Sequence, residues 1–140
     1  GERVAVLGFN AQATDTAHYL IAQGKKVTVI APEPAEAFGT GQAMMLNAFV
    51  KPAFFAAGGR LMPECTLKSV GDGEIVVTNS FGMDVTLACD CVVDASTMSP
   101  NTALADELSG EFDVHVIGDA AEPLSIQNAI TAGNLTARNC

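Results

Sequence analysis

Short apolar runs and helix-forming segments take turns at the start of the chain. Residues 3–7 are an apolar run that stops at Gly8, and residues 11–23 follow with helix formers and neither Pro nor Gly. After Gly24, which favours the end of a helix, residues 27–30 form a second apolar run. Both runs are continuously hydrophobic, as expected for parallel strands that are covered on both faces. The pattern predicts a strand, a tight turn, a helix and a second strand, joined as one βαβ unit.

Further helix and strand patterns follow, and in the middle of the chain short strand patterns succeed one another without a helix between them. Three short strand patterns separated by Gly-containing turns predict an antiparallel meander. A helix pattern with a Met and Phe stripe precedes the meander; we expect this stripe in the core, and Pro52 to kink or split the helix. The elements expected after residue 31 are a helix at 42–57, strands at 60–62, 65–70, 74–79, 84–88 and 90–95, a helix at 102–108, a strand at 113–117 and a helix at 124–138.

Together these patterns predict the fold class. Strands that alternate with helices favour an α/β architecture with a parallel sheet. We therefore expect an α/β, Rossmann-like three-layer domain, in which a central parallel sheet carries an inserted three-stranded antiparallel meander.

The composition fits one ordinary folded domain. The chain has 140 residues, of which 49% are hydrophobic and 16% are charged, enough to bury a sizeable core. The net charge of −9, with only seven Lys and Arg residues, argues against binding to nucleic acid or to an anionic membrane. The sequence has no signal-peptide pattern and no apolar run of transmembrane length, so we expect a cytoplasmic location.

Side chains that could carry out chemistry are few. Cys89 and Cys91 lie two apart in an expected strand, so we expect them to share one face as reduced, structural residues. His18 and His115 are interpreted as structural or surface residues. The sequence shows no metal-ligand cluster, catalytic triad or paired-acid motif, and we assign no catalytic and no metal-binding residue.

The turn after the first strand is where a dinucleotide pyrophosphate would bind, on the N-terminus of the following helix. The fingerprint for such a turn is G-x-G-x-x-G, whereas residues 8–13 read Gly-Phe-Asn-Ala-Gln-Ala. Gly8 can still make the turn. Asn10 tolerates a left-handed conformation, but its side chain crowds the approach that a second glycine permits, and Ala13 is a mild change. Gly8, Phe9, Asn10 and Ala13 are therefore candidate dinucleotide-binding residues of a weak motif.

The position expected to bind the ribose also departs from the motif. An acid should close the second strand about 20 residues further on, and Ala31 stands there instead. The nearest acids are Glu33 and Glu36, in a Pro-containing loop without arginine. A ribose 2′-phosphate would meet no partner in this loop, so a dinucleotide site here would favour NAD(H) over NADP(H).

Several stretches, taken in their order and spacing, carry a resemblance to known enzymes. They are residues 15–17, 19–20, 38–41, 100–101, 103–105 and 114–120. In these stretches and in the order of its elements, the chain is similar to the C-terminal nucleotide-binding lobe of the NADH:flavin oxidoreductase, 2,4-dienoyl-CoA reductase and trimethylamine dehydrogenase family, which is like the FAD-dependent pyridine nucleotide-disulfide oxidoreductases. The resemblance covers essentially the whole chain.

This resemblance implies that the chain is a fragment of a longer one. Residues 1–140 would form one NAD(P)/FAD-binding-type domain, with 1–101 as the nicotinamide-nucleotide lobe and 113–140 as the last strand and helix of the FAD domain. Gly118, Asp119 and Ala120 would lie beside the flavin ribityl chain, at a helix start. The lobe would pass electrons between NAD(P)H and FAD, while FMN and a 4Fe–4S cluster would belong only to N-terminal domains outside this sequence.

The same resemblance implies which partners the chain has, and it shows one more position at which this sequence differs from the family's dinucleotide-binding pattern. The rest of the protein's own chain, an FAD domain and a flavin-bearing barrel, would cover a domain-contact face, which could also support a homo-oligomer. In the turn after residue 94, Thr97 carries a side chain where the dinucleotide backbone would pass. Together with Asn10, Ala13 and Ala31, Thr97 suggests that the nicotinamide site is weakened or lost.

Three hypotheses about function remain open. The chain is a nucleotide-binding lobe of a flavin oxidoreductase, a degenerate Rossmann module with a structural or interaction role, or a free-standing sensor of an adenine nucleotide. Flavin colour and nucleotide affinity would separate them.

Overall fold

The computed structural model describes the backbone of residues 1–140 and every side chain except that of Met44. The chain divides into two compact units, Gly1–Thr97 and Met98–Cys140, which we call unit 1 and unit 2.

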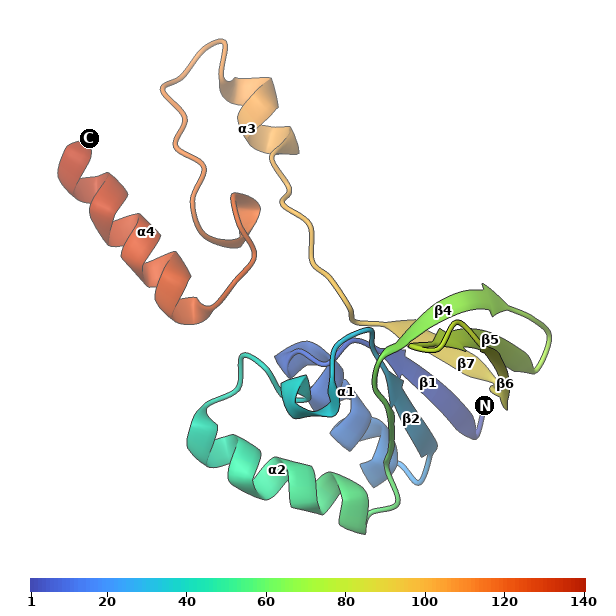
Figure 1. Ribbon diagram of the computed structural model, residues 1–140. Helices are drawn as coiled ribbons and strands as arrows, with labels where there is room; N and C mark the ends of the chain where they lie inside the picture. The colour runs from blue at the N-terminus through green and yellow to red at the C-terminus, as the bar shows by residue number, and fades with distance from the viewer. The chain divides into compact units, whose positions relative to one another are not determined.

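Unit 1 is built on a parallel sheet of four strands (Figure 1). The strands are β1 (Arg3–Leu7), β2 (Lys26–Ile30), β3 (Arg60–Met62) and β7 (Cys91–Asp94), in the order β3-β2-β1-β7. β1 pairs in parallel with β2 on one side and with β7 on the other. The central position of β1 explains why its apolar run is continuous, because both of its faces are covered.

Two helices cover one face of this sheet. Helix α1 (Ala11–Ala22) joins β1 to β2, and α2 (Met44–Ala56) joins β2 to β3 after the single-turn helix η1 (Ala35–Ala37). Phe38 and Phe54, both fully buried, pack with one another at a ring-centroid distance of 5.0 Å. Together with valines of β1 and β2 they form the first hydrophobic core.

A second sheet covers the opposite face. The strands β4 (Cys65–Val70), β5 (Glu74–Asn79) and β6 (Asp84–Ala88) form an antiparallel sheet in the order β4-β5-β6. Its inward residues form a second core with residues of β1 and β2. The predicted fold class is confirmed: unit 1 has helix, parallel-sheet and antiparallel-sheet layers, with the meander forming a sheet of its own.

Gly8 holds the carboxyl ends of β1 and β7 close together. It has a φ of +108°, and a Cβ atom placed on it would lie 2.8 Å from the Cα of Ser96 and 2.9 Å from the carbonyl oxygen of Ala95. Both contacts are with backbone, which cannot move aside as a side chain can. Only glycine fits this turn, as the sequence predicts.

Asp90 fastens the N-terminus to the start of β7. One carboxylate oxygen accepts hydrogen bonds from the N–H groups of Glu2 (2.8 Å) and Arg3 (2.9 Å), and the other accepts from Nε (3.0 Å) and Nη2 (2.5 Å) of Arg3. The Arg3 guanidinium, and then the two backbone N–H groups, hold the pKa of Asp90 well below its usual range.

Unit 2 contains α3 (Ala103–Leu108), the single-turn helix η2 (Gly118–Ala120) and α4 (Ile126–Asn139). Every described residue of this unit is at least partly exposed to solvent. The strand expected at 113–117 is wrong, because these residues pair with no strand in the described part of the chain. A strand needs a neighbour for its backbone hydrogen bonds, and an apolar pattern alone does not supply one.

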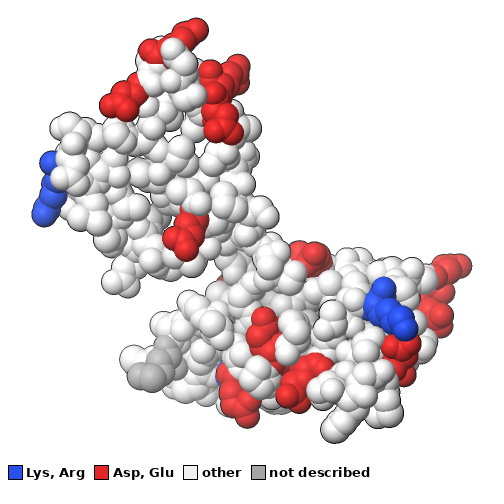
Figure 2. All heavy atoms as spheres, turned by 45° about the horizontal axis from the view of Figure 1, so that its top comes forward, with Lys and Arg blue, Asp and Glu red and all other residues white. Residues whose placement is uncertain are grey.

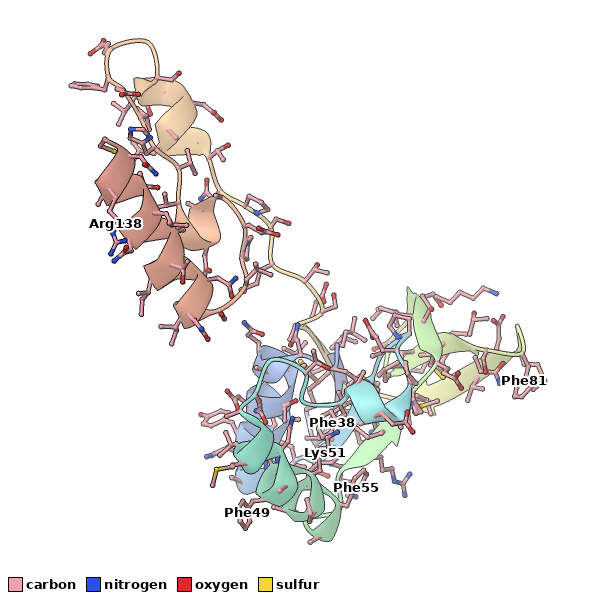
Figure 3. The ribbon with its side chains drawn as sticks, turned by 60° about the vertical axis from the view of Figure 1, so that its left-hand side comes forward. Phe38, Phe49, Lys51, Phe55, Phe81 and Arg138 are labelled. Atoms are coloured by element: carbon pink, nitrogen blue, oxygen red, sulfur yellow. The ribbon has the colours of Figure 1, made fainter. Side chains whose placement is uncertain are left out.

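Two expectations about side chains are also wrong. Of the Met and Phe stripe on α2, Phe54 is buried, whereas Met45, Phe49 and Phe55 are 78%, 73% and 51% exposed. Figure 3 shows Phe49 and Phe55 on α2. The cysteines at 89 and 91 do not share a face, because a turn at Asp90 separates β6 from β7 and leaves the first buried and the second exposed. Pro52 lies within α2 without splitting it.

Gly8→Ala should destabilise unit 1 strongly. The substitution adds both backbone strain and a collision with Ala95 and Ser96, so we expect a loss of at least about 3 kcal/mol in the free energy of unfolding. Gly24→Ala is the matched control, since Gly24 has a φ of +78° and a Cβ atom placed on it would have no neighbour within 4 Å. It should lose only about 1–2 kcal/mol. Urea unfolding of both variants measures the difference, and equal losses would contradict the role of close approach.

Asp90→Asn should reduce the pH dependence of stability. Because the folded-state pKa of Asp90 is depressed, its stabilisation is present above the unfolded-state pKa of about 4 and is lost as the pH falls toward the folded-state value. We expect the free energy of unfolding of the wild type to fall from about pH 4 to about pH 2, and that of the variant to fall less. Urea unfolding at a series of pH values tests this, with Asp72→Asn, on an exposed turn, as the control that should behave like the wild type.

Candidate functional site

The strand order creates a crevice at the carboxyl ends of β1 and β7. From β1 the chain crosses to β2 on one side, whereas β7 joins β1 on the other side, so the sheet reverses its order between these two strands. Open α/β sheets bind their ligands at such a point. The Gly8 turn and residues 95–97 meet there, which brings candidate residues from the two ends of unit 1 together.

The side chain of Asn10 spans this crevice. Its Oδ1 accepts a hydrogen bond from the N–H of Ala13 (2.9 Å), and its Nδ2 donates to the carbonyl oxygens of Ala95 (2.7 Å) and Ser96 (3.1 Å). We call these three hydrogen bonds the Asn10 latch. Asn10 has φ −73° and ψ 179° and acts as the N-cap of α1, so it does not use the left-handed conformation that an asparagine tolerates. The latch uses an N–H group of the helix N-terminus that could otherwise face a phosphate.

The loop after β2 closes over the same turn. The N–H groups of Gly39 (2.7 Å) and Thr40 (3.2 Å) both donate to the carbonyl oxygen of Phe9. The Phe9 side chain is buried and packs edge-on against Phe38, with ring centroids 5.6 Å apart. The side chain of Phe9 is therefore part of the core, and its carbonyl oxygen is hydrogen-bonded to the loop.

The other candidate residues near this turn differ in accessibility. Ala13 and Ala31 are buried, with 0% and 1% of their surface exposed, whereas Glu33 and Thr97 are exposed. The backbone of Ala31 is hydrogen-bonded to Met62 and Cys65. Ala31 thus directly follows β2 as a core residue, and Glu33 is exposed two residues further on.

Two charged groups beside the crevice were not assigned from the sequence. Lys51 of α2 donates from Nζ to the carbonyl oxygen of Glu36 (3.0 Å), which brings a cation to the loop that follows β2 (Figure 3). Asp94 ends β7 opposite Leu7 and accepts hydrogen bonds from Oγ (2.6 Å) and N–H (3.0 Å) of Ser96. These bonds lower the pKa of Asp94, and its negative charge at the crevice is unfavourable for a pyrophosphate.

In unit 2, residues 118–120 form η2, which packs against α4. Gly118 has a φ of +60°, and a Cβ atom placed on it would lie 3.4 Å from the Cβ of Ala129. Asp119 and Ala120 are exposed. The helix that starts at this point is only the single turn η2, because the longer α4 begins at Ile126 with Ser125 as its cap.

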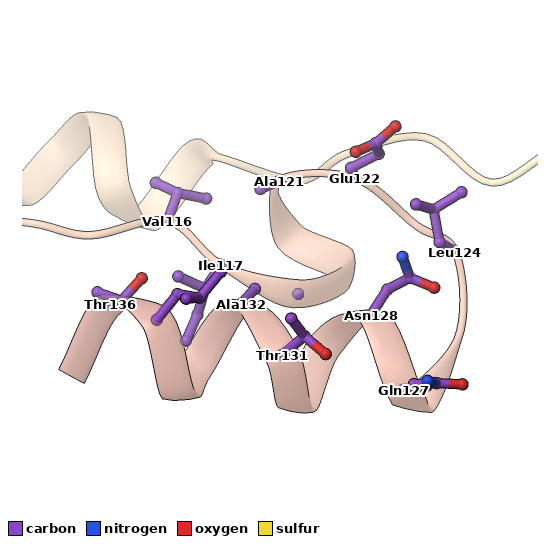
Figure 4. Close-up of a pocket in the computed structure, with 12 residues that line it drawn as sticks. Val116, Ile117, Ala121, Glu122, Leu124, Gln127, Asn128, Thr131, Ala132 and Thr136 are labelled. Carbon is purple, nitrogen blue, oxygen red and sulfur yellow. The ribbon is translucent and has the colours of Figure 1, made fainter. Parts of the chain in front are cut away.

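A cavity of about 700 Å³ lies between the η2 segment and α4 (Figure 4). Gly118 lines it, with Ile117 and Leu124 on one side and Asn128 and Thr131 of α4 on the other. The lining is mostly apolar and small, with amide and hydroxyl groups but few charges. Such a surface suits a neutral or aromatic group, or another part of a protein.

The described residues offer few other chemical groups. His18 packs edge-on against Phe54 at 5.9 Å, and His115 is exposed, with its Nε2 3.7 Å from Asp113. All four cysteines are free. Among the described residues, no group of three or more His, Cys, Asp or Glu side chains could hold a metal ion. No helix in the described part of the chain is long and apolar enough to cross a membrane.

Solved structures with the same fold identify the class of domain. The chain aligns with 2-naphthoyl-CoA reductase at a TM-score of 0.84 and 27% identity, over 95% of this chain and 20% of that one. Histamine dehydrogenase from Rhizobium sp. 4-9 gives a TM-score of 0.87 and 20% identity, over 99% and 22% of the two chains. The 6-hydroxypseudooxynicotine amine oxidase HisD from Pseudomonas geniculata N1 gives 0.80 and 22%, over 96% and 22%. The chain has the nucleotide-binding domain fold of flavin oxidoreductases.

The structural matches agree with the resemblance seen in the sequence. The chain is similar in structure to the NAD-binding region of these three proteins, which are flavoproteins of the trimethylamine dehydrogenase and old yellow enzyme family, so the resemblance is confirmed at the level of this domain's fold. The chain spans about a fifth of the length of these three solved structures. Neither a protein-family model nor a curated protein sequence matches the chain.

Proposed function

We propose that this chain is the nucleotide-binding lobe of a flavin-dependent oxidoreductase that resembles 2,4-dienoyl-CoA and 2-enoate reductases. In this proposal the lobe helps to pass electrons between NAD(P)H and FAD. The observation that carries it is the Gly8 turn, which opens α1 at the crevice between β1 and β7. A helix N-terminus at such a crevice is where α/β folds bind a dinucleotide pyrophosphate.

The lobe works as part of a longer chain in this proposal. Unit 2 has exposed apolar side chains on α4, with Ile126 and Ile130 81% and 67% exposed, and none of its described residues is fully buried. A 14-residue helix without a packed apolar face is only marginally stable in water. An FAD domain would cover this face and place its flavin near Gly118, Asp119 and Ala120. FMN and a 4Fe–4S cluster would be held by N-terminal domains that include the flavin barrel.

Asn10 makes the proposed dinucleotide site a weak one. A pyrophosphate that approaches the N-terminus of α1 has to displace the Asn10 latch, whose three hydrogen bonds each contribute roughly 0.5–1.5 kcal/mol. Their loss would cost on the order of 2–4 kcal/mol, which weakens affinity roughly 30- to 1,000-fold. The charge of Asp94 adds to this penalty.

The loop after β2 bears on the choice of dinucleotide. Glu33 and Glu36 are exposed and would repel a ribose 2′-phosphate, while the Glu33 carboxylate could accept hydrogen bonds from ribose hydroxyls. Lys51 could favour a phosphate in this loop, but its Nζ already donates a hydrogen bond to the carbonyl oxygen of Glu36. We therefore propose a preference for NAD(H) over NADP(H).

The Asn10 latch also favours a second candidate function. If no nucleotide displaces the latch, the lobe is a degenerate Rossmann module that serves as a structural or interaction domain. The latch itself would then be part of the structure, since it ties α1 to the end of β7.

Asn10→Gly should strengthen dinucleotide binding. Glycine removes the latch and restores the second fingerprint position, so we expect NADH and ADP to bind at least about tenfold more tightly than to the wild type. Isothermal titration calorimetry measures the affinities, with adenosine as the control ligand, because it lacks phosphates and should gain nothing.

Two results would contradict parts of this proposal. Micromolar binding of NADH to the wild type would contradict the weak site, because it would show that the latch does not close the site. Variant protein that is folded by circular dichroism but binds neither NADH nor ADP would support the structural module instead.

A further inference from the structure

Unit 1 has a second cavity at the opposite end of its parallel sheet. This cavity, of about 350 Å³, is lined by Arg3 of β1, Lys26 and Thr28 of β2 and Arg60 of β3, together with residues of β5 and β6. We call it the inter-sheet cleft. It lies at the amino ends of the parallel strands, whereas the Gly8 turn lies at their carboxyl ends.

The strand register explains why three cations gather there. Arg3 pairs with Lys26, and Arg60 pairs with Thr28, two residues beyond Lys26 on the same strand. Paired residues and residues two apart on a strand point to the same face of a sheet. The side chains of all four residues therefore lie on the face that the second sheet covers, where that sheet leaves the cleft open.

The opposite wall of the cleft is apolar. Ile75 of β5 and Leu87 of β6 are paired with one another and form this wall, and Ala5 of β1, on the parallel sheet, also lines the cleft. Ile75 and Ala5 are buried, with 1% and 2% of their surface exposed. The buried thiol of Cys89 also lines this wall and donates to the carbonyl oxygen of Cys91 (3.0 Å).

The distribution of charge at the cleft is unusual for this protein. The chain has a net charge of −9, and acidic side chains are spread over the face shown in Figure 2. Yet the cleft is lined by three of the seven Lys and Arg residues and by no acid among the described residues. Arg3 is already paired with Asp90, whereas the side chains of Lys26 and Arg60 make no hydrogen bond or ion pair among the described residues.

We propose that the inter-sheet cleft binds a small organic anion with an apolar body, such as a medium-chain carboxylate. The apolar body lies against Ala5, Ile75 and Leu87, and the carboxylate is held by Lys26 and Arg60. A volume of about 350 Å³ is at the small end of ligand pockets, which suits a ligand of this size. The site is separate from the proposed dinucleotide site and does not depend on it.

The test uses sodium octanoate as the probe and the 140-residue chain as the protein. Titration followed by two-dimensional ¹H–¹⁵N NMR should give saturable shifts at the amides of residues that line the cleft, and isothermal titration calorimetry should give the affinity. We expect 1-octanol, which has the same chain without the charge, to bind at least about tenfold more weakly.

Two double variants separate the cleft from general charge effects. Lys26→Gln with Arg60→Gln should weaken octanoate binding at least about tenfold. Lys25→Gln with Arg138→Gln changes the net charge equally, at residues that do not line the cleft, and should leave binding unchanged. Because none of these four side chains makes a hydrogen bond or ion pair among the described residues, the NMR spectra should show that both variants are folded.

Three results would overturn the proposal. The first is no saturable shift at about 10 mM octanoate, which is too weak for a specific site. The second is an equal loss of affinity in both double variants, and the third is a set of shifts centred on the exposed apolar residues of α2 or α4. The last result would show that octanoate binds these surfaces without specificity.

Discussion

The contact between Gly8 and the backbone of Ala95 and Ser96 is the constraint on which unit 1 depends. It joins the two carboxyl ends that flank the reversal in strand order, and it does so at a distance that no side chain permits. Because β1 ends there, α1 starts in the position that lets it cover the sheet. The Asn10 latch then fastens the start of α1 to the same turn. Fold and candidate site thus depend on the same contacts at this turn.

Much of unit 1 could be predicted from the sequence because its local patterns agree with its tertiary structure. The continuous apolar runs of β1 and β2 are those of strands covered on both faces, and glycines mark the turns of the meander. Prediction from the sequence fails where burial or strand pairing depends on another segment that must pack against the element. The stripe on α2 has helical spacing, yet only Phe54 reaches the sheet. Residues 113–117 have a strand pattern, but no strand in the described chain pairs with them.

The position of the candidate site in the chain could be predicted from the sequence, but the contacts that its residues make could not. The fingerprint located the turn at residues 8–13, and its missing glycines indicated a weak site. The partners of Asn10 lie more than 80 residues further along the chain, at Ala95 and Ser96, and no local pattern indicates them. The ion pair of Arg3 with Asp90 and the approach of Lys51 to Glu36 are likewise set by tertiary structure. The strand register places the three cations of the inter-sheet cleft on one face of the sheet. This clustering could not be predicted from the sequence, because the sequence does not show which residues pair across the strands.

The two units differ in how far they can be stable by themselves. Unit 1 has two hydrophobic cores around β1, whereas the described residues of unit 2 include no buried one. Native-state hydrogen exchange of the chain tests this difference most directly. The amides of β1 should exchange only by global unfolding of unit 1, and those of α4 should exchange nearly as fast as in an unstructured peptide. Slow exchange of α4 equal to that of β1, or fast exchange of β1, would contradict the account.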